Sequence, residues 1–112
     1  MPGPFEKLSS LDRLIHEPAR LAILTALNAC RSADFLFLLS ITGLTKGNLT
    51  THLAKLERAG LVTIQKVLRG KVPRTQLALT EHGRQMIKEH WRRLEALRKA
   101  AQKWRAPSMV HS

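Results

Sequence analysis

The chain has 112 residues, of which 44% are hydrophobic, enough for one modest core but too few for two domains of ordinary size. Nineteen Lys and Arg against eight Asp and Glu give a formal net charge of +11, which favours nucleic acid as a partner and an anionic membrane surface second. The single cysteine, Cys30, excludes an intrachain disulfide scaffold and a thiolate metal cluster, so we expect a cytoplasmic protein without a cofactor. Both of the most apolar stretches are shorter than the roughly 20 residues that span a bilayer.

The positive charge is unevenly distributed along the chain. Residues 1–43 are neutral, with four basic and four acidic side chains. Residues 44–76 hold seven basic side chains against Glu57 alone, a net of +6. The remaining +5 comes from eight basic and three acidic side chains nearer the C-terminus. This segregation favours a cationic binding face, with a merely solvated basic surface as the alternative.

Helical periodicity predicts two helices before residue 31. A short first helix includes Leu8, Leu11, Leu14 and Ile15 and ends before Pro18. Pro18 suits the first turn of a second helix, which runs to about residue 30 and turns the small Cys30 side chain inward.

A third helix covers residues 35–42. Ser32 and Asp34 offer oxygen acceptors for its first N–H groups, and Gly43 ends it. Residues 35–39 are apolar on every side, so this helix is either buried or presents an added docking or ligand surface.

A fourth helix, residues 46–59, follows Thr45 as its N-cap and ends before Gly60. Leu49, Leu53 and Leu56 form its inward stripe, and short polar or basic side chains cover the other faces near its N-terminus. His52 lies at the border between the two. Such a pattern is typical of a helix whose first turns enter a DNA major groove.

Beyond Gly60 the period changes to two, which predicts strands at residues 62–65 and 76–79 joined by a turn-rich basic segment. Thr80 then caps a last helix from Glu81 to about residue 105, and residues 1–105 form one domain followed by a disordered tail, 106–112. A narrow apolar seam on this helix predicts a dimer interface, comprising Ile87, His90, Trp91, Leu94, Leu97, Ala101 and Trp104.

Three segments of the sequence, in this order, resemble one family. Residues 44–53 (LTKGNLTTHL) with 56–62 (LERAGLV) resemble the recognition helix of the small winged helix-turn-helix transcriptional regulators related to the MarR and ArsR families. The Thr-Lys-Gly-Asn-Leu opening is most similar to a compact MarR-like branch. Residues 16–24 resemble the group's opening helix and residues 79–84 its segment after the wing. The resemblance covers residues 16 to about 97.

The resemblance implies a mainly α fold with a small β-hairpin wing and a long C-terminal dimerisation helix. It also implies a homodimeric, sequence-specific regulator of double-stranded DNA, often a repressor, which reads an inverted repeat whose half-sites are about 34 Å apart. Contact with the DNA is carried over to Lys46, Asn48, Thr50, Thr51 and Lys55 on the helix and to Arg69, Lys71 and Arg74 on the wing.

Other functions are weighed against this one. His82 and His90 lie about 12 Å apart along a helix, too far to chelate one metal ion, so we expect no metal site. The sequence contains no phosphate loop, nucleophile elbow or paired carboxylates, so we expect no enzyme. A winged-helix module for protein assembly, or an architectural DNA-binding protein without sequence preference, remains the alternative. A small-molecule effector is left open.

Overall fold

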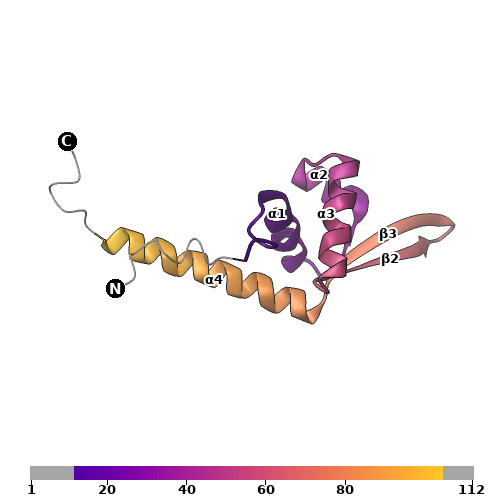
Figure 1. Ribbon diagram of the computed structural model, residues 1–112. Helices are drawn as coiled ribbons and strands as arrows, with labels where there is room; N and C mark the ends of the chain where they lie inside the picture. Colours follow the sequence, from indigo (N-terminus) through magenta and orange to yellow (C-terminus); the bar gives the residue numbers. More distant parts are fainter. Residues whose placement is uncertain (1–11, 105–112) are drawn as a thin grey trace.

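The computed structural model describes residues 12–104, which form four helices and a three-stranded antiparallel sheet (Figure 1). The predicted fold class, mainly α with a β-hairpin wing and a long last helix, is confirmed. The predicted C-terminal tail lies outside the described residues. In chain order the elements are α1 (Pro18–Asn28), β1 (Ala33–Asp34), α2 (Phe35–Thr42), α3 (Lys46–Arg58), β2 (Val62–Arg69), β3 (Val72–Leu79) and α4 (Glu81–Lys103).

The short helix predicted before Pro18 is wrong for the residues that the structure describes. Residues 12–17 form turns, and the Asp12 carboxylate accepts the N–H of Leu14 at 2.8 Å. Aspartate side chains compete in this way with helical hydrogen bonds. One backbone bond of helical spacing, from the N–H of His16 to the Asp12 carbonyl at 2.8 Å, closes a single turn there. Glu17 is extended and accepts the N–H of Arg20 at 2.9 Å, so α1 begins at Pro18 as predicted. The earlier part of the predicted helix falls outside the described residues.

Cys30 also departs from its predicted place. α1 ends at Asn28, and Cys30 lies beyond it in a partly buried turn rather than on the inward face of the helix. Its N–H donates to the carbonyl of Leu27 at 3.3 Å. The periodicity of α1 therefore stops before the cysteine.

The pair α2–α3 is formed by local signals that the sequence displays. Asp34 caps α2 by accepting the N–H of Leu36 at 2.8 Å. Gly43 ends α2 in a left-handed conformation, with φ 69°, which lets the chain turn sharply. Thr45 then caps α3 by accepting the N–H of Asn48 at 3.1 Å. The start of each helix and the turn between them follow the prediction.

The sheet has the order β1-β3-β2, and its hairpin is longer than predicted. β2 pairs with β3 from Val62 opposite Leu79 to Arg69 opposite Val72. Only the inner half of this hairpin has a buried face, so alternation of apolar and polar residues is visible there alone. The two-residue β1, which pairs with β3, was not predicted because it is too short to show a period.

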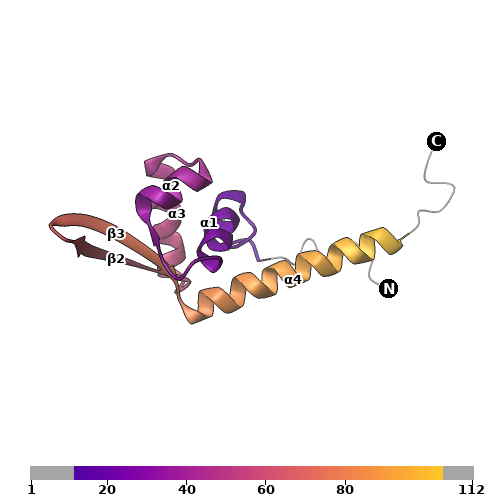
Figure 2. The same cartoon turned by 180° about the vertical axis from the view of Figure 1, so that it is seen from behind.

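The core lies where α1, α2, α3 and the sheet meet the first turns of α4, and Thr80 joins α4 to it. The Thr80 hydroxyl accepts the N–H of Gly83 at 2.9 Å and donates to the carbonyl of Gly60 at 2.6 Å. The wing and α4 extend from this body in opposite directions (Figures 1 and 2). No helix within residues 12–104 is long and apolar enough to cross a membrane. The buried residues include Ile23, Leu24, Leu27, Leu38, Leu49, Leu53, Leu56, Leu61, Leu77 and Ile87.

Candidate nucleic-acid interface

α3 presents a continuous polar surface because its three leucines hold it against the body. Leu49, Leu53 and Leu56 are all buried, with at most 2% of each side chain exposed. The residues on the rest of the helical circumference face solvent. They include the five side chains predicted to contact DNA, which we call the recognition face: Lys46, Asn48, Thr50, Thr51 and Lys55.

His52, at the border of this face, is turned toward α1. Its Nδ1 lies 3.7 Å from Glu17 Oε2, and the side chain is 20% exposed. Burial raises the pKa of Glu17, but the backbone N–H groups of Arg20 and Ala19, followed by His52, lower it more, so this pKa lies below its usual value. The Glu17 carboxylate therefore stays ionised and links α3 to the start of α1.

The cations of α3 and the wing, apart from Arg74, are exposed. None of them except Arg74 has an ion-pair partner among residues 12–104. Unpaired cations are the groups that release condensed counterions when they approach phosphates. This unpaired set comprises Lys46, Lys55, Arg58, Lys66, Arg69 and Lys71.

Arg74 differs from the other two predicted wing residues. Arg69 and Lys71 are exposed at the end of the hairpin, whereas Arg74 Nε lies 3.8 Å from Asp34 Oδ2 and its side chain is 38% exposed. Asp34 also caps α2, so the same carboxylate serves a helix and an arginine. Arg74 is therefore a partly neutralised group.

Lys66 and Arg58 also lie on this surface, although neither was among the residues predicted to contact DNA. Lys66 lies on the same side of β2 as Ile64, because side chains alternate along a strand. Ile64 lines the cavity next to α3, so Lys66 is on the side of the strand that faces α3. Lys66 could have been placed by extending the period-two pattern of the strand past Gln65, although the apolar residues that mark this pattern end there.

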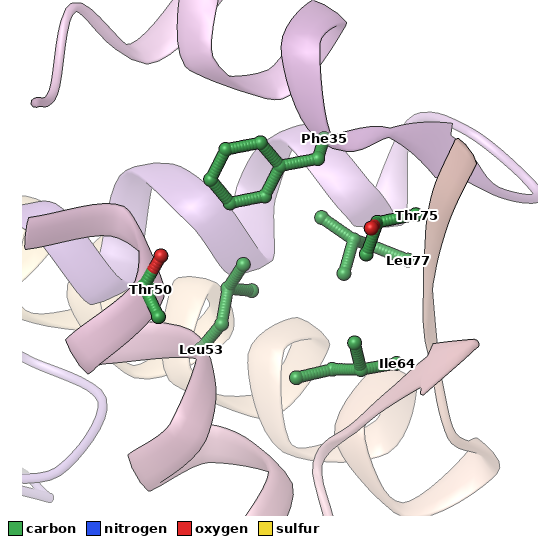
Figure 3. A pocket seen from close by; sticks show the side chains of 6 residues that line it. All are labelled: Phe35, Thr50, Leu53, Ile64, Thr75 and Leu77. Carbon is green, nitrogen blue, oxygen red and sulfur yellow. The ribbon is translucent and has the colours of Figure 1, made fainter. Parts of the chain in front are cut away.

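A cavity of about 270 Å³ separates α3 from the wing (Figure 3). Phe35 reaches into it from the start of α2, Thr50 and Leu53 from α3, and the two strands supply the other side. Its lining is apolar apart from the two threonine hydroxyls and carries no charge. The lining residues are Phe35, Thr50, Leu53, Ile64, Thr75 and Leu77.

The apolar helix α2 is half buried and half exposed. Leu38 is completely buried, but Leu36, Phe37 and Ile41 are each about half exposed, at 51%, 50% and 51%. One side of α2 is therefore core, and the other is a small apolar surface facing solvent.

The residues predicted as a dimer seam on α4 divide into two groups. Ile87 is fully buried in the core, and His90, 2% exposed, packs against His16 with 3.1 Å between His16 Nδ1 and His90 Nε2. These two assignments are corrected, because the N-terminal half of α4 docks on its own chain and leaves neither side chain accessible to a partner. Leu97 is also largely buried, at 9% exposure.

The remaining seam residues are accessible. Trp91 and Trp104 are 45% and 44% exposed, Ala101 is exposed and Leu94 is half-buried. Trp91 Nε1 donates to Thr25 Oγ1 at 2.9 Å, which ties its ring to the outer side of α1.

A groove beside Trp91 enlarges this surface and was missed in the sequence. It has a volume of about 480 Å³ and lies between α1 and α4. The sequence feature that could have predicted this groove is the apolar outer side of α1. A helix that packs on one side only would have polar residues there. The groove is lined by Pro18, Leu21, Ala22, Thr25, Ala26 and Trp91.

The histidines on α4, His82 and His90, are the residues for which no metal site was predicted. Burial first, and the neighbouring His16 second, lower the pKa of His90. Among residues 12–104, no group of three or more His, Cys, Asp or Glu side chains is arranged to hold a metal ion.

The comparison with known proteins agrees with this architecture. The family described as "Winged helix DNA-binding domain" matches residues 19–98, so the chain belongs to that family. It is a small DNA-binding transcriptional regulator, and its winged-helix fold is shared with solved structures of MarR-family regulators.

Individual relatives support the same class. The chain is 33% identical to a transcriptional regulator homologue from Pyrococcus horikoshii, with a TM-score of 0.80, covering 86% of this chain and 97% of that one. It is 34% identical over 79 residues to an uncharacterized protein of Methanocaldococcus jannaschii, covering 70% of this chain and 85% of that protein. The PcaV transcriptional regulator of Streptomyces coelicolor shares the fold at 21% identity, with a TM-score of 0.69 and coverage of 92% and 72%.

Proposed function

We propose that the protein binds an inverted-repeat operator in double-stranded DNA as a homodimer and represses transcription. The observation that carries this proposal is the recognition face of α3, exposed beside a hairpin whose cations, apart from Arg74, have no ion-pair partner among the described residues. The helix would enter the major groove while the wing meets the adjoining backbone.

The side chains of the recognition face suit base reading. Asn48 has the donor and acceptor needed to pair with adenine, and Lys46 and Lys55 donate to the O6 and N7 atoms of guanine. The methyl groups of Thr50 and Thr51 fit thymine methyls, while their hydroxyls reach phosphates. The cations of the wing supply affinity that does not depend on sequence.

Dimerisation is proposed through the surface that α1 and α4 leave open. Trp91 has nearly half of its surface exposed next to the apolar groove on α1, and aromatic side chains beside a groove are typical interface anchors. Two chains joined there by a two-fold axis would present two recognition faces to half-sites about 34 Å apart.

The test is fluorescence anisotropy with the DNA upstream of the protein's own gene and a shuffled duplex of equal composition, at two salt concentrations. A preference of about 10³ or more at the higher salt supports a sequence-reading regulator. Equal, steeply salt-dependent binding to both duplexes would instead favour an architectural DNA-binding protein. Absence of binding to either duplex would favour a protein-assembly module. Sedimentation of the complex measures whether two chains bind each duplex.

The sign of regulation needs its own measurement. Transcription in vitro from a promoter that overlaps the bound site falls as a repressor is added and rises if the protein is an activator. The variant Asn48→Ala, with an exposed side chain and no role in capping, serves as the matched control. Cytoplasmic localisation is part of the same proposal, since the DNA target lies in that compartment.

The cavity between α3 and the wing favours response to a small effector as a second proposal. A dry cavity of about 150 Å³ already accommodates benzene, so about 270 Å³ suits one substituted ring, and the uncharged lining favours a neutral one. PcaV was solved with its natural ligand. The probe is 4-methylphenol: it should weaken DNA binding of the wild type and leave the cavity-filling variant Thr75→Leu unaffected. Equal effects on both would exclude this site.

A further inference from the structure

The outer side of α2 stays exposed in the described chain although it is apolar. Leu36, Phe37 and Ile41 are 51%, 50% and 51% exposed, and they share one side of an eight-residue helix. Leu38, on the opposite side, is completely buried. Single exposed apolar residues need no explanation, but three large ones on two turns of one helix form a patch of the kind that marks an interaction surface. We call Leu36, Phe37 and Ile41 the apolar face of α2.

The hydroxyl groups of α2 do not oppose burial of this face. The Ser40 hydroxyl donates to the carbonyl of Phe37 at 2.7 Å, and the Thr42 hydroxyl donates to the carbonyl of Leu38 at 2.8 Å. Both hydroxyl hydrogens are therefore bonded within the helix itself. A partner that covers the apolar face of α2 leaves neither donor unpaired, so burial carries no penalty from these two groups.

The apolar face of α2 is separate from the surfaces proposed for DNA and for the dimer. α2 packs on the core through Leu38, so its exposed side points away from the body. α2 lies on the far side of the body from α4 in both views (Figures 1 and 2), whereas the groove proposed for dimerisation lies between α1 and α4. A dimer formed at that groove therefore exposes the apolar face of α2 once on each chain.

The charges around this face favour a second copy of the chain as its occupant. α2 itself contains no charged residue. Asp34, directly before it, is paired with Arg74, and residues 1–43 are neutral as a whole. An acidic partner would find no cation on this helix. Two copies can meet here without the repulsion that the unpaired cations of α3 and the wing would produce elsewhere.

We propose that the apolar face of α2 binds the same face of a second copy, so that dimers associate with one another. A two-fold axis at this contact places Phe37 of each copy against the apolar face of the other. Association of dimers rests on the proposed function, whereas the contact itself requires neither DNA nor the groove between α1 and α4.

The size of the face determines the strength of this contact. Three large side chains, each about half exposed, offer on the order of 300 Å² per chain, whereas stable interfaces bury about 800 Å² per partner. The contact is therefore weak in solution. It becomes effective where two dimers are already held close together, as on neighbouring sites of one DNA duplex, because their effective concentration is then high.

Sedimentation equilibrium of the full chain without DNA tests the contact directly. The average mass of the wild type should rise above that of a dimer between roughly 10 μM and 1 mM protein. The double variant Phe37→Ser/Ile41→Ser should remain a dimer over this range. Serine has a helix propensity close to those of Phe and Ile, so α2 should persist, and thermal unfolding checks this.

The matched control is Leu68→Ser, which removes an exposed apolar side chain, 70% accessible, from the wing instead of from α2. It should associate as the wild type does. A wild type that remains a dimer up to about 1 mM, a double variant that associates like the wild type, or an equal loss in the control would overturn the inference.

Salt distinguishes this contact from one made by charges. Raising KCl from about 0.1 M to about 0.5 M should leave the association unchanged or strengthen it, because salt screens the repulsion between the basic chains and does not weaken an apolar contact. DNA binding should become weaker over the same range. An association that falls with salt as steeply as DNA binding would assign it to the cations and overturn the inference.

Duplexes with one or two copies of the bound upstream site separate this inference from the proposed function. The wild type should bind the two-site duplex cooperatively, about tenfold more tightly per site than the one-site duplex, at one or more whole-turn spacings. Phe37→Ser/Ile41→Ser should bind one site as the wild type does and show no cooperativity. Independent binding by the wild type at every spacing would overturn the role on DNA. If the wild type bound neither duplex, the proposed function would fail while the sedimentation result stood.

Discussion

The two basic regions of the protein carry similar net charge, but they differ in how many of their cations are paired with carboxylates. α3 and the wing expose cations that, apart from Arg74, have no ion-pair partner among residues 12–104. On α4, by contrast, Arg92 and Arg93 both pair with Glu89, and Arg98 pairs with Glu95. Hydrogen bonds from Arg98 hold the pKa of Glu95 below its usual value, so that carboxylate stays charged.

The difference shows that net charge alone does not locate a DNA-binding surface. A cation already held by a carboxylate releases fewer counterions when DNA approaches than one that faces solvent alone. The two regions also differ in packing. The start of α4 lies in close contact with the body, while the start of α3 stands open.

The largest expected effect concerns charge on the two helices. Replacing Lys46 and Lys55 together by Ala should weaken operator binding about 100-fold and lower the salt slope by nearly 2, because both cations are unpaired. The matched double variant Arg92→Ala/Arg93→Ala removes the same charge from α4 and should leave affinity within about threefold. Anisotropy titrations over a range of KCl measure both. A similar loss of slope in the two variants would show that α4 also contacts DNA.

The packing difference predicts opposite changes in the free energy of unfolding when glycine is replaced by alanine in α4 and in α3. A Cβ atom at Gly83 would lie 2.0 Å from the carbonyl oxygen of Leu61, so Gly83→Ala should lower the free energy of unfolding by about 3 kcal/mol. Nothing lies within 4 Å of a Cβ at Gly47, and Gly47→Ala should raise it by about 0.5–1 kcal/mol. Urea unfolding tests both. Destabilisation by Gly47→Ala would contradict the open position of α3.

Removing the carboxylate that pairs with Arg74 should make this arginine an unpaired cation like the others of the wing. Asp34→Asn keeps an N-cap for α2, since Asn caps as well as Asp, but removes the carboxylate from Arg74. We expect DNA affinity to rise about threefold and the salt slope to steepen by up to 0.9. The matched control, Glu89→Gln, frees two arginines on α4 and should change neither quantity. Equal responses would remove the distinction between the regions.

The smallest effect is expected from pH. Because burial and His16 lower the pKa of His90 in the folded chain, folding favours its neutral form. Its contribution to stability is therefore fully present above the unfolded histidine pKa of about 6.5 and is lost progressively as the pH falls below it. Asp12, which opposes the shift, and Arg93, which adds to it, are the other charges that act on the group.

Thermal unfolding at pH 7.5 and pH 5.5 measures this dependence. The wild type should have a lower Tm at pH 5.5, and His90→Gln should flatten the difference while lowering Tm at pH 7.5. A variant whose Tm still falls as steeply as the wild type would assign the pH dependence to other groups. DNA binding measured at the same two pH values separates loss of fold from loss of contact.

Much of the recognition face could be predicted because it depends on neighbours in the sequence. Leucines three or four residues apart determine which side of α3 is buried, and Thr45 and Gly43 determine where α3 and the turn before it lie. The other side of the helix then faces outward. Lys66 was missed since the apolar alternation of β2 ends before it, where the strand leaves the core.

The sequence by itself determined the starts of α1 to α4, the inner half of the hairpin and the outward side of α3, since caps and periodicity act over a few residues. Only the tertiary structure decided which α4 residues are buried, because His90 meets His16 from 74 residues away along the chain. It likewise decided which cations are neutralised, as for Arg74 beside Asp34. Burial and ion pairing depend on contacts between distant segments, and no local pattern reports which segments will meet.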